Sequence, residues 1–64
     1  MKTKTSREIL KAIKADGWYE VNAVGSHHQF LHPAKKGKVT VQHPKKEITG
    51  DTLKSIERQS GITF

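Results

Sequence analysis

Apolar residues recur at helical spacing near the start of the chain. Ile9 and Ile13 are four positions apart, with a further leucine beside the first, and charged residues occupy the other faces. This spacing predicts a helix with one buried face. Thr5 and Glu8 fit a capping box at its beginning, and an Asp-Gly pair is a typical end. We therefore expect a helix over about residues 6–15.

The middle of the chain reads as three strands. Residues 18–23 are rich in aromatic and β-branched types, 27–32 follow a Gly-Ser turn, and 38–42 alternate between apolar and polar. Prolines end the second and the third of these segments. The three strands are close in sequence, so an antiparallel meander is the natural pairing.

A second helix is expected over about residues 51–60. Leu53 and Ile56 are its apolar stripe, Asp51 or Thr49 can cap it, and a glycine follows the last turn. The order is then α-β-β-β-α, within one domain that spans residues 1–64. Two helices on one face of a three-stranded antiparallel sheet make a two-layer α+β domain.

Strand alternation divides the second strand between two faces. Phe30 must point toward the helices, as must the two valines of the third strand. His28 and His32 share the face of Phe30 and should lie inside or at the rim of the core. The open face should carry His27, Gln29 and Leu31.

The first strand has the same choice of faces. The core set that we expect there is Tyr19, Val21 and Ala23. Glu20 and Asn22 would then point outward, and Trp18 would lie at the end of the sheet.

Composition narrows the function. Twelve Lys and Arg residues oppose six Asp and Glu residues, which gives a net charge of +6 on 64 residues. Such a field attracts polyanions, and nucleic acid is the commonest of them. The chain has no cysteine, and no apolar run approaches the roughly 20 residues that cross a bilayer. We expect a cytoplasmic protein that binds nucleic acid and does not enter a membrane.

The four histidines raise the question of a metal site. His27 and His28 are adjacent, so a strand would point them to opposite faces, and no thiol or carboxylate clusters with them. We expect no metal and no other cofactor. His28 and His32 fit structural positions beside Phe30, with a ring nitrogen bonded to the backbone.

His27 fits a catalytic role because it is expected on the uncovered face of a basic domain. Histidine can take or give a proton near neutral pH, and a base that deprotonates the ribose 2′-OH starts internal cleavage of RNA. Lysines near the phosphorane would stabilise its charge. Candidates for RNA binding are Lys35, Lys36 and Lys38, with Lys45 and Lys46 behind them. The group that protonates the leaving 5′-oxygen could be His43, a lysine or water.

Several motifs, in order, resemble the HicA toxin family. They are Asp16-Gly17-Trp18, Gly25-Ser26-His27-His28-Gln29-Phe30, His32-Pro33, Val39-Thr40-Val41, His43-Pro44, Gly50-Asp51-Thr52-Leu53-Lys54-Ser55-Ile56 and Gly61-Ile62. The likeness spans roughly residues 6–62. It implies a fold like a double-stranded-RNA-binding domain, the same α-β-β-β-α order reached from the patterns.

The resemblance also implies an activity and a partner. Members of this family are small toxins of toxin–antitoxin pairs that cleave messenger RNA without requiring the ribosome, and a HicB-type antitoxin blocks them. The family's essential histidine follows the Gly-Ser turn, which is His27 here, and no metal is implied. Two residues depart from the family pattern: Asn22 stands where a basic residue is common, and Asp51 separates Gly50 from the Thr-Leu pair.

Two other functions are compatible with the sequence. A non-catalytic RNA-binding module would use the same fold, because double-stranded RNA is recognised by shape and phosphate contacts. A plain protein-interaction domain would present its basic face to an acidic partner. Loss of RNA cleavage in His27→Ala, with folding and RNA affinity retained, would distinguish the enzyme from both.

Overall fold

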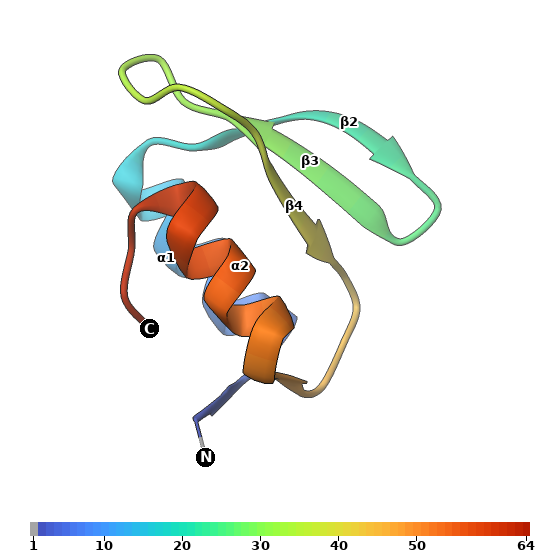
Figure 1. The fold of residues 1–64 in the computed structure, drawn as a ribbon. Coiled ribbons are helices and arrows are strands. Elements are labelled where there is room, and N and C mark those ends of the chain that lie inside the picture. Colours follow the sequence, from blue (N-terminus) through green and yellow to red (C-terminus); the bar gives the residue numbers. More distant parts are fainter. Residues whose placement is uncertain (1) are drawn as a thin grey trace.

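The computed structural model describes residues 2–64 and contains two helices and two small sheets. Helix α1 covers Ser6–Asp16 and α2 covers Gly50–Ser60. The strands β2 (Tyr19–Val24), β3 (His27–Leu31) and β4 (Val39–Gln42) form an antiparallel sheet in that order. Both helices lie on one side of this sheet (Figure 1). The expected α+β architecture is confirmed and is compatible with the double-stranded-RNA-binding type.

The ends of both helices follow local sequence chemistry. Thr5 caps α1 through a complete capping box with Glu8, and Gly17 ends it in a left-handed conformation. Thr49 precedes α2 in an extended conformation, but its side chain makes no capping hydrogen bond. Helix α2 forms although Asp51 separates Gly50 from the Thr-Leu pair, where it departs from the family pattern.

A second, two-stranded sheet was not expected from the sequence. β1 (Thr3–Lys4) pairs antiparallel with β5 (Ile48–Thr49). This pairing holds the segment before α1 against the two residues that precede α2. Strands of two residues carry too little periodicity to be recognised in a sequence.

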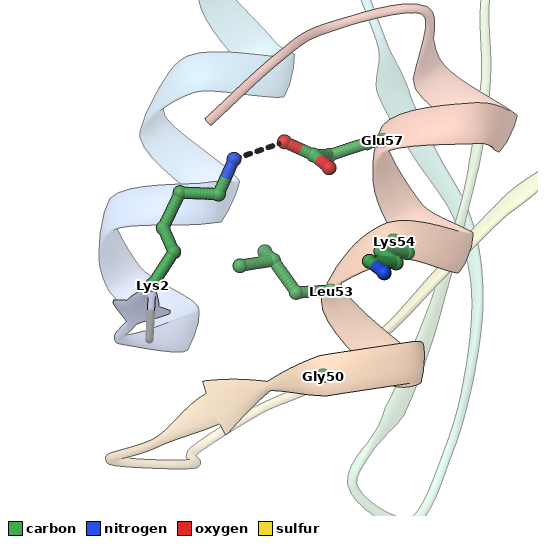
Figure 2. A pocket seen from close by; sticks show the side chains of 5 residues that line it. All are labelled: Lys2, Gly50, Leu53, Lys54 and Glu57. Carbon is green, nitrogen blue, oxygen red and sulfur yellow. Dashed lines mark hydrogen bonds and ion pairs between the residues drawn. The ribbon is translucent and has the colours of Figure 1, made fainter.

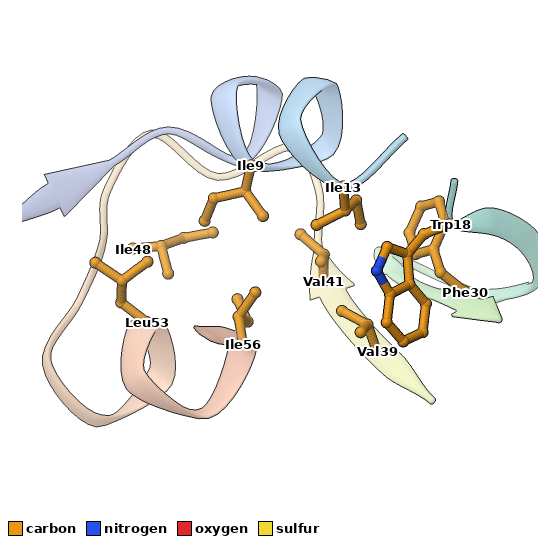
Figure 3. Packing of buried hydrophobic residues seen from close by; sticks show 9 residues of the cluster. All are labelled: Ile9, Ile13, Trp18, Phe30, Val39, Val41, Ile48, Leu53 and Ile56. Atoms are coloured by element: carbon orange, nitrogen blue, oxygen red, sulfur yellow. The ribbon is translucent and has the colours of Figure 1, made fainter. Parts of the chain in front are cut away.

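The core lies between the two helices and the sheet (Figure 3). Its nine apolar side chains are Ile9, Ile13, Trp18, Phe30, Val39, Val41, Ile48, Leu53 and Ile56. Phe30 and both valines of β4 point inward, as strand alternation predicts, and Leu53 and Ile56 form the buried stripe of α2. Trp18 is only 2% exposed and is a core residue, where we expected it at the end of the sheet.

The predicted core set in β2 is wrong. All six residues of β2 are exposed, including Tyr19 and Val21 at 50% and 46%. A β-bulge between Glu20 and Asn22 shifts the register, so Tyr19 lies opposite Leu31 on the open face and Glu20 lies opposite Phe30. The helices pack mainly on the side of β4, and β2 therefore has little to be buried against (Figure 1).

Candidate active site

His27 begins β3 directly after the β2–β3 turn, and its side chain is exposed. It lies opposite Val24 of β2 and Gln42 of β4 in the antiparallel ladder. Phe30, three residues along the same strand, is fully buried against the helices. Because side chains alternate along a strand, His27 must emerge on the face away from the helices. The predicted face of this imidazole is confirmed.

The open face around His27 carries apolar as well as polar side chains. Val24, which is 62% exposed, pairs directly with His27. Tyr19 and Leu31 pair with one another further along the sheet, and both are exposed. This face can therefore meet a flat apolar partner, such as a nucleobase or another protein, next to an imidazole.

His28 points to the other side of the sheet, as expected. It is partly buried opposite Val41, and its Nδ1 lies 3.2 Å from a carboxylate oxygen of Glu20. A carboxylate accepts hydrogen bonds, so Nδ1–H is the donor. The sequence-based interpretation placed a backbone group there and Glu20 on the outer face; the bulge in β2 brings Glu20 to His28 instead.

His43 lies beside His28, with ring centroids 5.8 Å apart. Its backbone N–H donates to the oxygen of Ser26 in the β2–β3 turn, over 2.8 Å. Its Nδ1 lies 2.7 Å from the hydroxyl of Ser6, which is buried at 2% exposure. The first turn of α1 therefore fixes His43 at the same end of the sheet as His27.

Ser6 also holds the chain after β4. Its hydroxyl oxygen accepts the N–H of Lys45 over 2.9 Å, and its own N–H donates to the oxygen of Lys45 over 2.9 Å. Nothing in the sequence pairs position 6 with positions 43 and 45, because the contact depends on the path of the β4–β5 loop.

The five candidate lysines divide between the two ends of the sheet. Lys45 and Lys46 follow β4, whose end lies beside His27. Lys36 and Lys38 belong to the β3–β4 loop, at the opposite end (Figure 1). β3 separates the two ends by roughly 13 Å at the usual rise per residue. Lys45 and Lys46 therefore lie nearer to His27 than Lys36 and Lys38 do, which is the reverse of the expected order.

The ammonium group of Lys35 makes hydrogen bonds within the folded protein. Its Nζ lies 2.6 Å from a carboxylate oxygen of Asp16 and 3.1 Å from the backbone oxygen of Ser60. These contacts join the final residues of α1 and α2 through the β3–β4 loop. The hydrogen bond from Lys35 lowers the pKa of the Asp16 carboxyl. This ammonium has a structural role, which sets it apart from the other four lysines.

His32 has the structural role expected of it, because both of its ring nitrogens are bonded to backbone atoms. Within residues 2–64, no three His, Asp or Glu side chains are arranged to hold a metal ion. Neither of the two described helices is long and apolar enough to cross a membrane.

One pocket lies away from these histidines. It has a volume of about 270 Å³ and is lined by Lys2, Gly50, Leu53, Lys54 and Glu57. An ion pair of 2.7 Å between Lys2 and Glu57 joins the N-terminal segment to α2 beside Leu53 (Figure 2). This pair helps to hold the first residues against the core.

Comparison with known proteins identifies the family. No curated protein matches the chain. The family model described as the HicA toxin of bacterial toxin–antitoxin systems matches residues 6–62. This span runs from the first residue of α1 to beyond the end of α2, and it includes His27 and all five candidate lysines. The chain therefore belongs to the HicA toxin family.

Proposed function

We propose that this toxin is a ribosome-independent endoribonuclease that cleaves messenger RNA with His27 as its general base. The observation that carries the proposal is the exposed imidazole on the open face of the sheet, directly after the β2–β3 turn. The net charge of +6 supports a polyanionic substrate. A cytoplasmic location agrees with such a substrate.

The proposed reaction is an internal transfer at phosphorus. His27 takes the proton of the ribose 2′-OH, and the 2′-oxygen attacks the neighbouring phosphate. The bond from phosphorus to the 5′-oxygen breaks, which leaves a 2′,3′-cyclic phosphate on one fragment. The 5′-oxygen takes a proton from water or a lysine and becomes the 5′-OH of the other fragment. The reaction uses no metal or other cofactor.

Lys45 and Lys46 are the lysines best placed to bind the RNA backbone near His27, because they leave β4 at the same end of the sheet. Lys36 and Lys38 would hold the RNA backbone at the far end. Lys35 contributes to RNA binding only if it leaves Asp16 and Ser60.

A HicB-type antitoxin is the proposed inhibitor, and the open face is its proposed binding surface. Exposed Val24, Tyr19 and Leu31 support this assignment, since protein interfaces bury apolar and aromatic groups at their centre. Covering Val24 would also cover His27, its direct partner in the ladder. RNA and antitoxin should then compete; an antitoxin that binds without displacing RNA would argue against this surface.

The decisive experiment compares wild-type protein with His27→Gln on a labelled RNA. We expect His27→Gln to lower the cleavage rate by about 10²–10⁴-fold, the usual contribution of a general base. Affinity for an uncleavable 2′-O-methyl RNA and the melting temperature should stay close to wild type. Cleavage should yield 2′,3′-cyclic phosphate ends and persist in a chelator. If pure wild-type protein cuts no RNA, the non-catalytic RNA-binding module is the better description.

A further inference from the structure

A basic pocket of about 240 Å³ lies between the first turn of α1 and the β4–β5 loop. Its lining residues are Thr5, Ser6, Arg7, His43, Pro44, Lys45 and Lys46. Every fully charged side chain in this lining is a cation. Three cations around one hollow, in a chain that is already strongly basic, form a site for an anion.

The contacts of Ser6 leave His43 able to donate a hydrogen bond from Nε2 into this pocket. The Ser6 oxygen already accepts the N–H of Lys45, so its hydroxyl hydrogen is free to point at His43 Nδ1, 2.7 Å away. A neutral imidazole that accepts at Nδ1 carries its hydrogen on Nε2. A protonated ring carries one there as well. In both forms, Nε2 is a hydrogen-bond donor.

The backbone of α1 is not the recognising element. Three amides of its first turn are engaged: Ser6 N–H with the oxygen of Lys45, Glu8 N–H with the Thr5 hydroxyl, and Ile9 N–H with the Thr5 oxygen. The anion would be held by side chains, namely Arg7, Lys45, Lys46 and the Nε2 of His43. Guanidinium and ammonium groups are the usual ligands of phosphate.

One backbone hydrogen bond connects the pocket to the turn that carries the proposed catalytic residue. His43 donates its backbone N–H to Ser26, the residue before His27, over 2.8 Å. His27 emerges on the open face, whereas the His43 ring packs against His28 on the helix side. An RNA strand with one phosphate at His27 can therefore reach the pocket by passing around the end of β4.

We propose that this pocket binds a backbone phosphate of the RNA substrate, distinct from the phosphate that is cleaved. The inference rests on the proposed function and adds to it a second phosphate subsite, with Arg7 and His43 as new binding residues. A substrate must then extend beyond the scissile dinucleotide to be cut efficiently. The identity of the bases would matter little at this subsite, since a phosphate carries no sequence information.

Steady-state cleavage kinetics distinguish phosphate binding at this subsite from a general effect of positive charge. The double variant Arg7→Ala/Lys46→Ala removes two pocket cations, and Lys11→Ala/Lys14→Ala removes two exposed cations elsewhere on α1. We expect the pocket variant to raise KM at least about 10-fold, as charged hydrogen bonds are lost, with kcat nearly unchanged. The control should change KM much less. Equal effects of the two double variants would refute the subsite.

A phosphate walk tests the subsite without catalysis. A 2′-O-methyl RNA strand receives one uncharged methylphosphonate at each position in turn, and its affinity is measured by fluorescence anisotropy. With wild-type protein, we expect loss of affinity at the scissile position and at a second position. Arg7→Ala/Lys46→Ala should abolish only the second loss, and Arg7→Lys should retain it. An unchanged pattern in the double variant would contradict the proposal.

The two experiments also separate the subsite from the proposed function. If wild-type protein cuts no RNA, the nuclease proposal fails, while the phosphate walk still decides whether the pocket binds a phosphate. If wild-type protein cuts RNA and the pocket variant behaves like the Lys11/Lys14 control, only the subsite fails.

Discussion

The Nε2 atom of His32 lies 2.7 Å from the backbone oxygen of Asp16, the last residue of α1. Nδ1 of the same ring accepts the N–H groups of Ala34 and Lys35, at 2.9 and 3.1 Å. Because Nδ1 accepts, Nε2 carries the hydrogen and donates it to Asp16. The ring also packs edge-on against Trp18, with centroids 5.2 Å apart. One neutral tautomer of His32 thus fastens the end of α1 to the loop after β3.

Replacing His32 should therefore destabilise the domain. His32→Ala removes these hydrogen bonds and an aromatic contact, and we expect it to cost about 2–3 kcal/mol. A 64-residue domain has only about 3–10 kcal/mol in total, so the effect on the melting temperature should be large. Urea unfolding followed by circular dichroism measures it. A decrease in the free energy of unfolding of less than about 0.5 kcal/mol would show that the His32 ring does not hold the end of α1 to this loop.

Gly17 is packed directly under the same ring. A Cβ at this position would lie 2.8 Å from His32 Nε2, and the backbone φ of +112° strains any residue other than glycine. We expect Gly17→Ala to destabilise the domain by more than 1 kcal/mol, through both strain and displacement of His32. In the His32→Ala background the same change should cost less, because the steric part is gone. Strictly additive effects in this cycle would contradict the contact.

Phe30 and His27 provide a matched pair on opposite faces of β3. Phe30 is fully buried, so Phe30→Ala should cost about 3–5 kcal/mol by leaving a cavity, enough to unfold much of the protein. His27 is exposed, so His27→Ala should change stability by no more than about 0.5 kcal/mol. Thermal unfolding of both variants measures this contrast. A large loss of stability at His27 would contradict its placement on the open face.

Sequence patterns predicted most of this fold because its signals are local. The capping box at Thr5, the stripe of α2 and the alternation of Val39 and Val41 each depend on neighbours a few residues away. The inward face of β3 followed from Phe30 alone, and the outward position of His27 followed from it.

The errors arose where tertiary structure overrides the local pattern. Nothing in the sequence marks the bulge that sends Tyr19 outward and Glu20 toward His28. The hydroxyl of Ser6 meets His43 only through the fold. The positions of the lysines could have been derived, however, since successive loops of an antiparallel meander lie at opposite ends of the sheet. That topology alone separates Lys36 from Lys46.

Acid should weaken the contact through which Lys35 joins Asp16, at the end of α1, to Ser60, at the end of α2. The hydrogen bond from Lys35 holds the pKa of Asp16 below its ordinary value of 3.8 in the folded protein. A lowered pKa means that the unfolded state binds protons more readily. The resulting stabilisation is complete above the unfolded pKa and is lost as the pH falls through the folded pKa. The lowered pKa values of Glu8, bonded to Thr5, and Glu57, bonded to Lys2, act in the same direction.

Asp16→Asn isolates the contribution of the ion pair between Asp16 and Lys35 to stability. At pH 7 we expect a lower melting temperature than wild type, because the charged partner of Lys35 is gone. As the pH falls through the lowered pKa of Asp16, the wild-type carboxyl also becomes protonated, so the two melting curves should converge. Glu47→Gln, which removes an exposed carboxylate from the β4–β5 loop, serves as the control. Its difference from wild type should stay small throughout the titration. A gap between Asp16→Asn and wild type that does not narrow as the pH is lowered would mean that the ion pair with Lys35 is not the source of the stabilisation.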